Sequence, residues 1–130
     1  MNSLALGQHF LPALEKLAVR IPNLRCAMLC TPDGFNLCSI GLSEDQVGKM
    51  AALSSSLLSV GDAAVSSLST NDAPTAPMEI MTMEADGLQI VSVKIERPSN
   101  YFVLMAAARS PLGVILMGVK ATANDIRQIL

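Results

Sequence analysis

Residues 21–39, IPNLRCAMLCTPDGFNLCS, combine a helix stop, two apolar segments and a tight turn. Pro22 lacks the N–H that a helix needs, and Asn23 tolerates the left-handed conformation at which helices end. Pro32 and Gly34 suit a turn, because Pro fixes φ and Gly accepts a positive φ. The stretch therefore predicts the end of a helix followed by a β-hairpin, with strands at residues 24–31 and 35–40.

Both strands of this hairpin are apolar on both faces, so the sheet that contains them needs helices on both sides. A first helix is predicted at residues 10–21, where apolar residues recur every three or four positions. Pro12 fits the first turn of such a helix, which leaves residues 1–9 as a separate turn or a loose arm.

The second predicted helix begins at Ser43, since Ser43 and Gln46 form a capping box. It continues to a loop at residues 69–77. Asp86-Gly87 is a hairpin turn signal between two further strands. Ser110 reads as an N-cap, with Pro111 at the first position of the last helix. The remaining predicted strands span residues 78–84, 88–95 and 101–107.

The predicted order is α-β-β-α-β-β-β-α, an α/β sandwich (α+β) with a five-stranded antiparallel sheet and helices on both faces. At 130 residues the chain is expected to form a single domain, residues 1–130. The net charge is −2 and no Lys/Arg cluster is present, which argues against a nucleic-acid partner. No apolar run reaches a membrane span, no signal peptide is evident, and three cysteines form no disulfide framework. A cytoplasmic location is therefore expected.

No motif in the chain predicts catalysis. Residues 41–49, GLSEDQVGK, superficially match a phosphate loop, but six residues separate the glycines and Met50 replaces Ser/Thr. His9 has no visible Ser or Cys partner and reads as a surface residue. Asp33 and Asp86 are expected to make local hydrogen bonds in turns. The chain is therefore predicted not to be an enzyme, and no cofactor is expected.

The three cysteines, Cys26, Cys30 and Cys38, are expected to be buried as small apolar residues. With a three-residue turn, all three would point to one face of the first hairpin. A zinc site would need four ligands, and the only histidine lies before the predicted first helix. No metal site is predicted, and an incidental disulfide in oxidising buffer remains open.

Taken together, these segments resemble the roadblock family, which includes dynein light chains and bacterial regulators of Ras-like GTPases. The family's pattern V-P-G-V-x-G-A-V-L…D-G-L-x-L-A-S is matched by residues 21–29 and 33–39. Its Ala/Leu-rich central helix is matched by residues 50–61, its hairpin by Asp86-Gly87, and its last-helix entry by residues 111–113. Asn23 and Cys26 stand where the family often has Gly. The order and spacing together carry the resemblance, which implies a roadblock/profilin-like fold.

The resemblance also implies a homodimer, or a heterodimer with a paralogous roadblock chain. In the family the central helices pair and the following strand pairs across the dimer. Independently, a flank of the central helix has no evident partner within the chain, and residues 78–84 read as an edge strand that needs covering. The alternative is an Ala/Ser surface beside a wide core stripe. The expected dimer residues are Leu53, Leu57, Val60, Ala64, Met81 and Met83.

The predicted function is a dimeric regulatory or scaffolding module that binds a small Ras-like GTPase through the paired central helices. No convincing arginine finger is visible among Arg25, Arg97 and Arg109. Two alternatives stay open: a structural adaptor in a motor or polarity complex, and a PAS-like ligand-sensing domain. The expected GTPase contacts are Lys49, Ala52, Ser56, Ser59 and Ala63.

Overall fold

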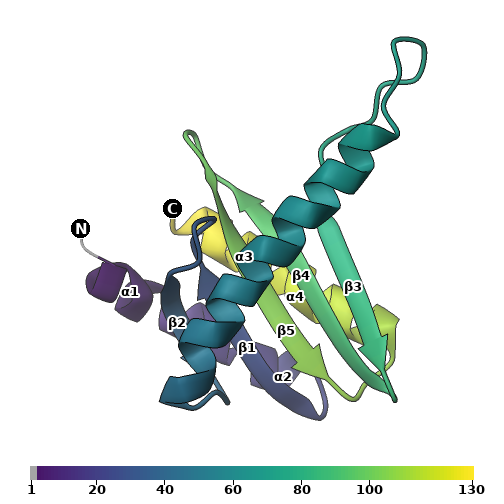
Figure 1. Cartoon of the computed structure of the whole chain (residues 1–130). Coiled ribbons are helices and arrows are strands. Elements are labelled where there is room, and N and C mark those ends of the chain that lie inside the picture. Colours follow the sequence, from purple (N-terminus) through teal and green to yellow (C-terminus); the bar gives the residue numbers. More distant parts are fainter. Residues whose placement is uncertain (1–2) are drawn as a thin grey trace.

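A five-stranded antiparallel sheet with helices on both faces forms the framework of residues 3–130, the part of the chain that the computed structural model describes (Figure 1). The α+β arrangement predicted from the sequence is confirmed. None of the helices in these residues is long and apolar enough to cross a membrane. In chain order the elements are α1 (Ser3–Glu15), α2 (Leu17–Arg20), β1 (Leu24–Cys30), β2 (Asn36–Ile40), α3 (Glu44–Ser67), β3 (Ile80–Ala85), β4 (Leu88–Glu96), β5 (Tyr101–Ala108) and α4 (Leu112–Gln128).

The strand order is β2-β1-β5-β4-β3, which places the most apolar strand at the centre. From Phe102 to Ala108 every residue of β5 is buried. A central strand has neighbours on both sides and helices on both faces, which explains this apolar run. The predicted edge strand, β3, does form an edge, and β2 forms the other.

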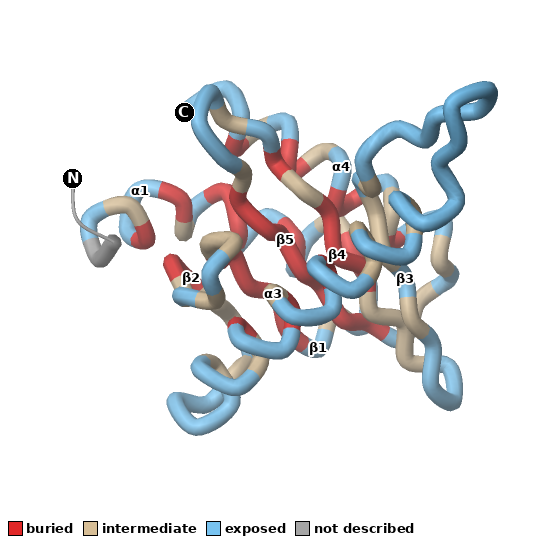
Figure 2. The backbone as a smooth tube through the Cα atoms, turned by 45° about the horizontal axis from the view of Figure 1, so that its top comes forward, coloured by how far each residue is buried: buried red, intermediate tan, exposed pale blue. Residues whose placement is uncertain are grey.

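The two faces of the sheet are covered unequally. Helices α1, α2 and α4 pack on one face, where Phe10, Leu14, Leu104 and Ile126 belong to a large core. On the other face α3 alone crosses the strands diagonally, and its C-terminal end projects past the sheet (Figure 1). Figure 2 shows the result: buried residues follow β1, β5 and β4, while most of α3 is exposed. The α3 face is therefore the incompletely covered side of the molecule.

The first helix begins earlier than predicted. α1 starts at Ser3, so the interpretation of residues 3–9 as a loose arm was wrong; Met1 and Asn2 lie outside the described residues. Pro12 lies inside α1, not in its first turn. The additional turns form because Leu6 packs against the core and Gly7 is buried on β2. The predicted single helix also divides at Lys16 into α1 and α2.

The turns at both ends of β1 follow the sequence. Asn23 has φ 57° and Gly34 has φ 91°, the left-handed conformations expected there. Ser43 and Gln46 form the predicted capping box at the start of α3. The predicted cap of α4 was wrong: Pro111 occupies the N-cap position, and Ser110 Oγ instead donates a hydrogen bond to the Pro22 carbonyl oxygen.

Candidate partner-binding surface

Helix α3 is held on the sheet by a narrow set of side chains. Ala51, Ser54 and Leu58 are its only residues, among those described, that are buried. Ala51 and Leu58 belong to one apolar cluster with Met28 of β1 and Met105 of β5, and Ser54 falls on the same side of the helix. For a helix of 24 residues this is a thin contact, since a helix covering a core usually buries a wide stripe. Much of the helix surface is left without a partner among the residues that the structure describes.

One exposed flank of α3 carries large apolar side chains. Leu53 is 47% exposed, Leu57 37% and Val60 66%, and Ala64 is exposed beside them. At 100° per residue these four positions fall within a 60° sector. The structure thus brings together the four α3 residues predicted for a dimer.

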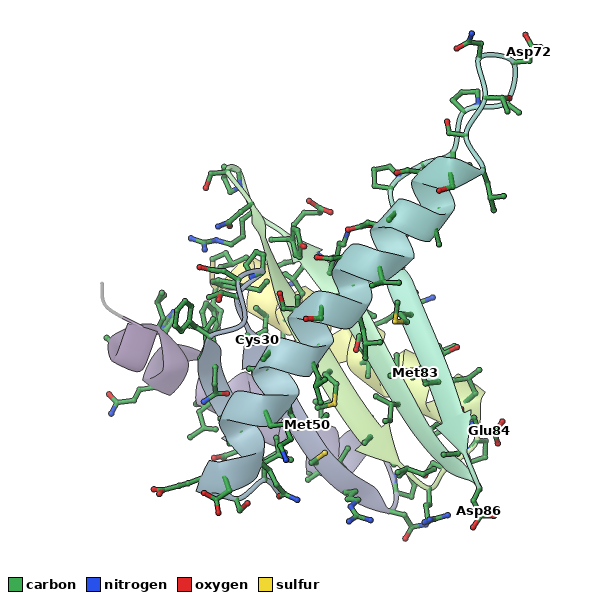
Figure 3. The ribbon with its side chains drawn as sticks, viewed as in Figure 1. Cys30, Met50, Asp72, Met83, Glu84 and Asp86 are labelled. Carbon is green, nitrogen blue, oxygen red and sulfur yellow. The ribbon has the colours of Figure 1, made fainter. Side chains whose placement is uncertain are left out.

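This apolar flank faces the β3 side of the sheet. Gly61 lies so close to β3 that an added Cβ would come within 2.6 Å of Met81 Cε. Met81 and Met83 are half-buried and pair with Ser92 and Ile90, on the face that α3 covers. Figure 3 shows that no helix covers β3 on this face around Met83. We call Leu53, Leu57, Val60, Ala64, Met81 and Met83 the apolar seam.

The second predicted set forms another flank of α3. All five residues are exposed, and they lie about a quarter turn from the apolar seam. This flank approaches the β1–β2 turn: a Cβ added to Gly34 would lie 3.4 Å from Ala52 Cα, and Ser55 Oγ donates to the Pro32 carbonyl oxygen. We call this set the small-residue flank; it comprises Lys49, Ala52, Ser56, Ser59 and Ala63.

Two features of the α3 face were not found from the sequence. Phe35 is 63% exposed in the β1–β2 turn, although it was expected to begin a strand. Lys94, on β4, has a side chain only 8% exposed and forms an ion pair with Asp62 of α3. A lysine within the largely apolar segment LQIVSVKIE was the available signal for Lys94, because a lysine at an inward position needs a partner.

The cysteines divide between the two faces, so the prediction that all three share one face was wrong. Cys26 and Cys30 belong to the α3-side cluster and Cys38 to the opposite core. The hairpin starts as expected, with Cys30 paired to Asn36. A bulge then pairs Leu29 with Cys38 and leaves Leu37 as the extra residue. One extra residue reverses the faces of all that follow.

Burial makes the three thiols poor nucleophiles. Desolvation raises the pKa of Cys30 and of Cys38 to about 12. It also raises the pKa of Cys26, an effect that the charge of Arg25 partly offsets. No group of three or more His, Cys, Asp or Glu side chains in the described residues is arranged to hold a metal ion. The cysteines therefore contribute packing to both layers.

The other charged candidates occupy surface or turn positions. His9 is exposed, as predicted, with Nε2 3.4 Å from the Ile129 carbonyl oxygen. Arg109 donates to the carbonyl oxygen of Asp86, and Arg97 lies 4.3 Å from the centre of the Phe102 ring. These contacts give both arginines a role in holding the ends of strands.

A cavity of about 330 Å³ lies between β3, β4 and α4, lined by Glu79, Lys120 and Arg127 among others. It is on the face away from α3. A PAS-like ligand-sensing domain would have a pocket lined with polar groups beneath its helices, whereas the side chains under α3 are mainly apolar. The cavity lies beside α4, so it is not a pocket between α3 and the sheet.

No protein-family model matches the chain, and no curated protein sequence matches it. Solved structures do. A roadblock/LC7 domain from Streptomyces avermitilis superposes with a TM-score of 0.77 at 23% identity, covering 90% of this chain and 93% of that one. The chain has the roadblock fold.

Two further structures extend the comparison. An MglB protein in a tetrameric arrangement matches the roadblock fold of this chain with a TM-score of 0.78 at 17% identity, over 96% of this chain and 90% of that one. Profilin IA of Acanthamoeba castellanii matches with a TM-score of 0.57 at 12% identity, over 91% and 96%. The roadblock/profilin-like fold expected from the sequence is thereby confirmed, and at these identities the likeness concerns the fold.

Proposed function

We propose that this protein is a dimeric regulatory or scaffolding module that binds a small Ras-like GTPase on its α3 face. The observation that carries the proposal is the exposed apolar seam on a helix that buries only three of its residues. Exposed apolar patches of this kind mark sites of association. The roadblock fold, and an MglB relative of that fold in a tetrameric arrangement, support self-association.

A second copy of the chain, or a paralogous roadblock chain, is the proposed partner of the apolar seam. In a two-fold dimer the same surface serves both subunits, so Leu57 and Val60 of one copy would meet the same seam of the other. The free edge of β3 lies on the same side, and pairing of two β3 strands would satisfy its unpaired backbone groups. Helix and strand would then contribute to one continuous interface.

The small-residue flank is the proposed docking site for the GTPase. It lies a quarter turn from the seam, so dimerisation through the seam leaves it open. A GTPase bound there in only one nucleotide state would have its switch equilibrium shifted toward that state. The chain would act in the cytoplasm without catalysing a reaction itself, and any effect on hydrolysis would come from positioning the GTPase's own residues.

The test is the solution mass of the wild type and of Val60→Asp, measured by light scattering over a range of concentrations. A charge at Val60 would have to be desolvated in the seam, so we expect a wild-type dimer and a folded Val60→Asp monomer. Val19→Asp is the matched control, because Val19 is 89% exposed in α2 on the opposite face. A wild type that is monomeric at every concentration would contradict the dimer. Equal solution masses for Val60→Asp and Val19→Asp would also contradict it.

The nucleotide turnover of a candidate GTPase separates a regulator from an adaptor. Addition of the wild-type protein should change the rate of GTP hydrolysis or of nucleotide exchange if it regulates. Binding with both rates unchanged would favour the structural adaptor.

A further inference from the structure

The last nine residues of α3, which follow Leu58, contain no buried apolar anchor. Ala51, Ser54 and Leu58 hold the middle of the helix on the sheet, but beyond Leu58 no described α3 residue is buried. The contacts toward the sheet there come from half-buried positions, with Gly61 against Met78 and Met81. Methionine side chains are flexible, so these contacts alone would permit the helix to shift.

An ion pair between Asp62 and Lys94 holds this last part of α3 on the sheet. Lys94 Nζ lies 2.7 Å from Asp62 Oδ1 and 2.9 Å from Asp62 Oδ2, so the carboxylate accepts from the ammonium group through both oxygens. The lysine side chain is 8% exposed, whereas Asp62 is 35% exposed. Lys94 Nζ also lies 4.9 Å from the centre of the Tyr101 ring, where the aromatic face favours a cation.

The position of Lys94 is fixed by the sheet. Lys94 pairs with Val103 of β5. Its backbone N–H donates a hydrogen bond to the carbonyl oxygen of Glu79, which precedes β3. A buried charge needs its partner close by, because separation leaves it desolvated and unpaired. The lysine therefore restricts Asp62, and with it one turn of α3, to a narrow range of positions over β4.

We propose that the Asp62–Lys94 ion pair is a positioning device that sets the tilt of α3 across the sheet and so shapes the apolar seam. Asp62 lies between Val60 and Ala64 in the sequence, but its side chain projects from the other side of α3, toward Lys94 on the sheet. Met81 is the β3 residue that Gly61 approaches. Displacement of α3 at Asp62 would separate the helical members of the seam from Met81 and Met83. The link to association rests on the proposed dimer, whereas the restraint on α3 does not.

The experiment combines hydrogen exchange with sedimentation of the full chain. Asp62→Asn removes the countercharge of Lys94, and Lys94→Met removes the charge while it keeps an apolar stem. We expect both variants to raise amide exchange at residues 59–67 and to weaken dimerisation by about tenfold or more. Lys94→Met leaves no unpaired ammonium group, so it guards against a result caused only by misfolding of Asp62→Asn.

The chain offers a matched control on its other face. Arg20 Nη2 lies 2.9 Å from Asp125 Oδ2 and joins α2 to α4, with both side chains about equally exposed at 30% and 29%. Asp125→Asn should leave exchange at residues 59–67 and the dimer constant unchanged. Asp125→Asn also shows how much the loss of an ion pair between two other elements changes amide exchange and dimerisation.

The outcomes are distinct. If exchange at residues 59–67 rises no more in Asp62→Asn and Lys94→Met than in Asp125→Asn, the positioning role is wrong. If exchange rises and the dimer constant is unchanged, the pair restrains α3 but does not shape the seam, which overturns the proposal. If the wild type is a monomer, the proposed dimer fails, while the exchange measurement still decides whether the ion pair restrains α3.

Discussion

Gly7 of α1 lies directly against the backbone carbonyl of Leu37 in β2, so that a Cβ at position 7 would overlap the carbonyl oxygen. Leu37 is also the extra residue of the β-bulge in the first hairpin. The helix and the bulge therefore meet at a point where the helix backbone has no room for a side chain. This contact explains why α1 extends to Ser3.

Gly7→Ala should destabilise the fold, because the added methyl group must push helix and strand apart. We expect a loss of about 1–3 kcal/mol in the free energy of unfolding. Gly48→Ala is the control: it is also within a helix, but nothing lies within 4 Å of its added Cβ. That variant should gain about 0.5–1 kcal/mol. Urea unfolding at one protein concentration measures both, and equal effects would contradict the close approach.

Ser43→Ala should lower the free energy of unfolding by about 1 kcal/mol, because it removes one half of the capping box of α3. Ser43 Oγ accepts a hydrogen bond from the Gln46 N–H at 3.3 Å, and Gln46 Oε1 accepts from the Ser43 N–H at 3.0 Å. Ser66→Ala, in the exposed last turns of the same helix, should be neutral or slightly stabilising. Thermal unfolding of both variants tests this, and a Ser43→Ala as stable as Ser66→Ala would speak against the cap.

Cys30→Ala should change how stability depends on pH. In the native state burial raises the pKa of Cys30 from its ordinary value of 9.0 to about 12, so the native protein holds a proton that the unfolded chain releases. The contribution of the buried thiol is fully present below about pH 9 and is lost as the pH rises toward 12.

The measurement is the difference in unfolding free energy between the wild type and Cys30→Ala from pH 8 to pH 11, because the two proteins differ only at this thiol. That difference should shrink as the pH rises, by up to about 1.4 kcal/mol per pH unit. A difference independent of pH would show that the thiol is accessible to water. Native Cys30 should also react slowly with a thiol reagent at pH 8 and rapidly in urea.

Ser56→Arg should block the GTPase without affecting self-association. Ser56 is exposed in the middle of the small-residue flank, and a long side chain there would hold a partner surface away from α3. We expect affinity for the GTPase to fall about tenfold or more, with an unchanged solution mass. Ala18→Arg, at an exposed position of α2, is the control. Equal affinities of the two variants would place the GTPase elsewhere.

Local signals in the sequence predicted much of the fold. Asn23 and Gly34 are residue types that tolerate a positive φ, so each of them indicates a turn at its position. The capping box located the start of α3, and the strand predicted at residues 101–107 is β5. These features depend on residues close to one another in the chain.

Features that depend on distant contacts were not predicted. Pro12 indicated a helix start, but packing of Gly7 against Leu37 favours helix on both sides of it. The bulge at Leu37 has no strong local signal, so the face of Cys38 was wrong. The pairing of Lys94 with Asp62 joins residues 32 positions apart. The exposure of the apolar seam agrees with the interface prediction, and its role stays a prediction.

The position of β5 between β1 and β4 has a consequence for synthesis on the ribosome. The first hairpin is made early, and both of its faces are apolar. The strand that pairs with β1, β5, is made much later because it comprises residues 101–108. Until that segment leaves the exit tunnel, the hairpin has only α1 and α2 to cover one face and a thinly attached α3 for the other. Exposed apolar strands in nascent chains are prone to aggregate. A chaperone that binds extended apolar segments should therefore associate with nascent chains that end before Tyr101 and be released once β5 completes the sheet.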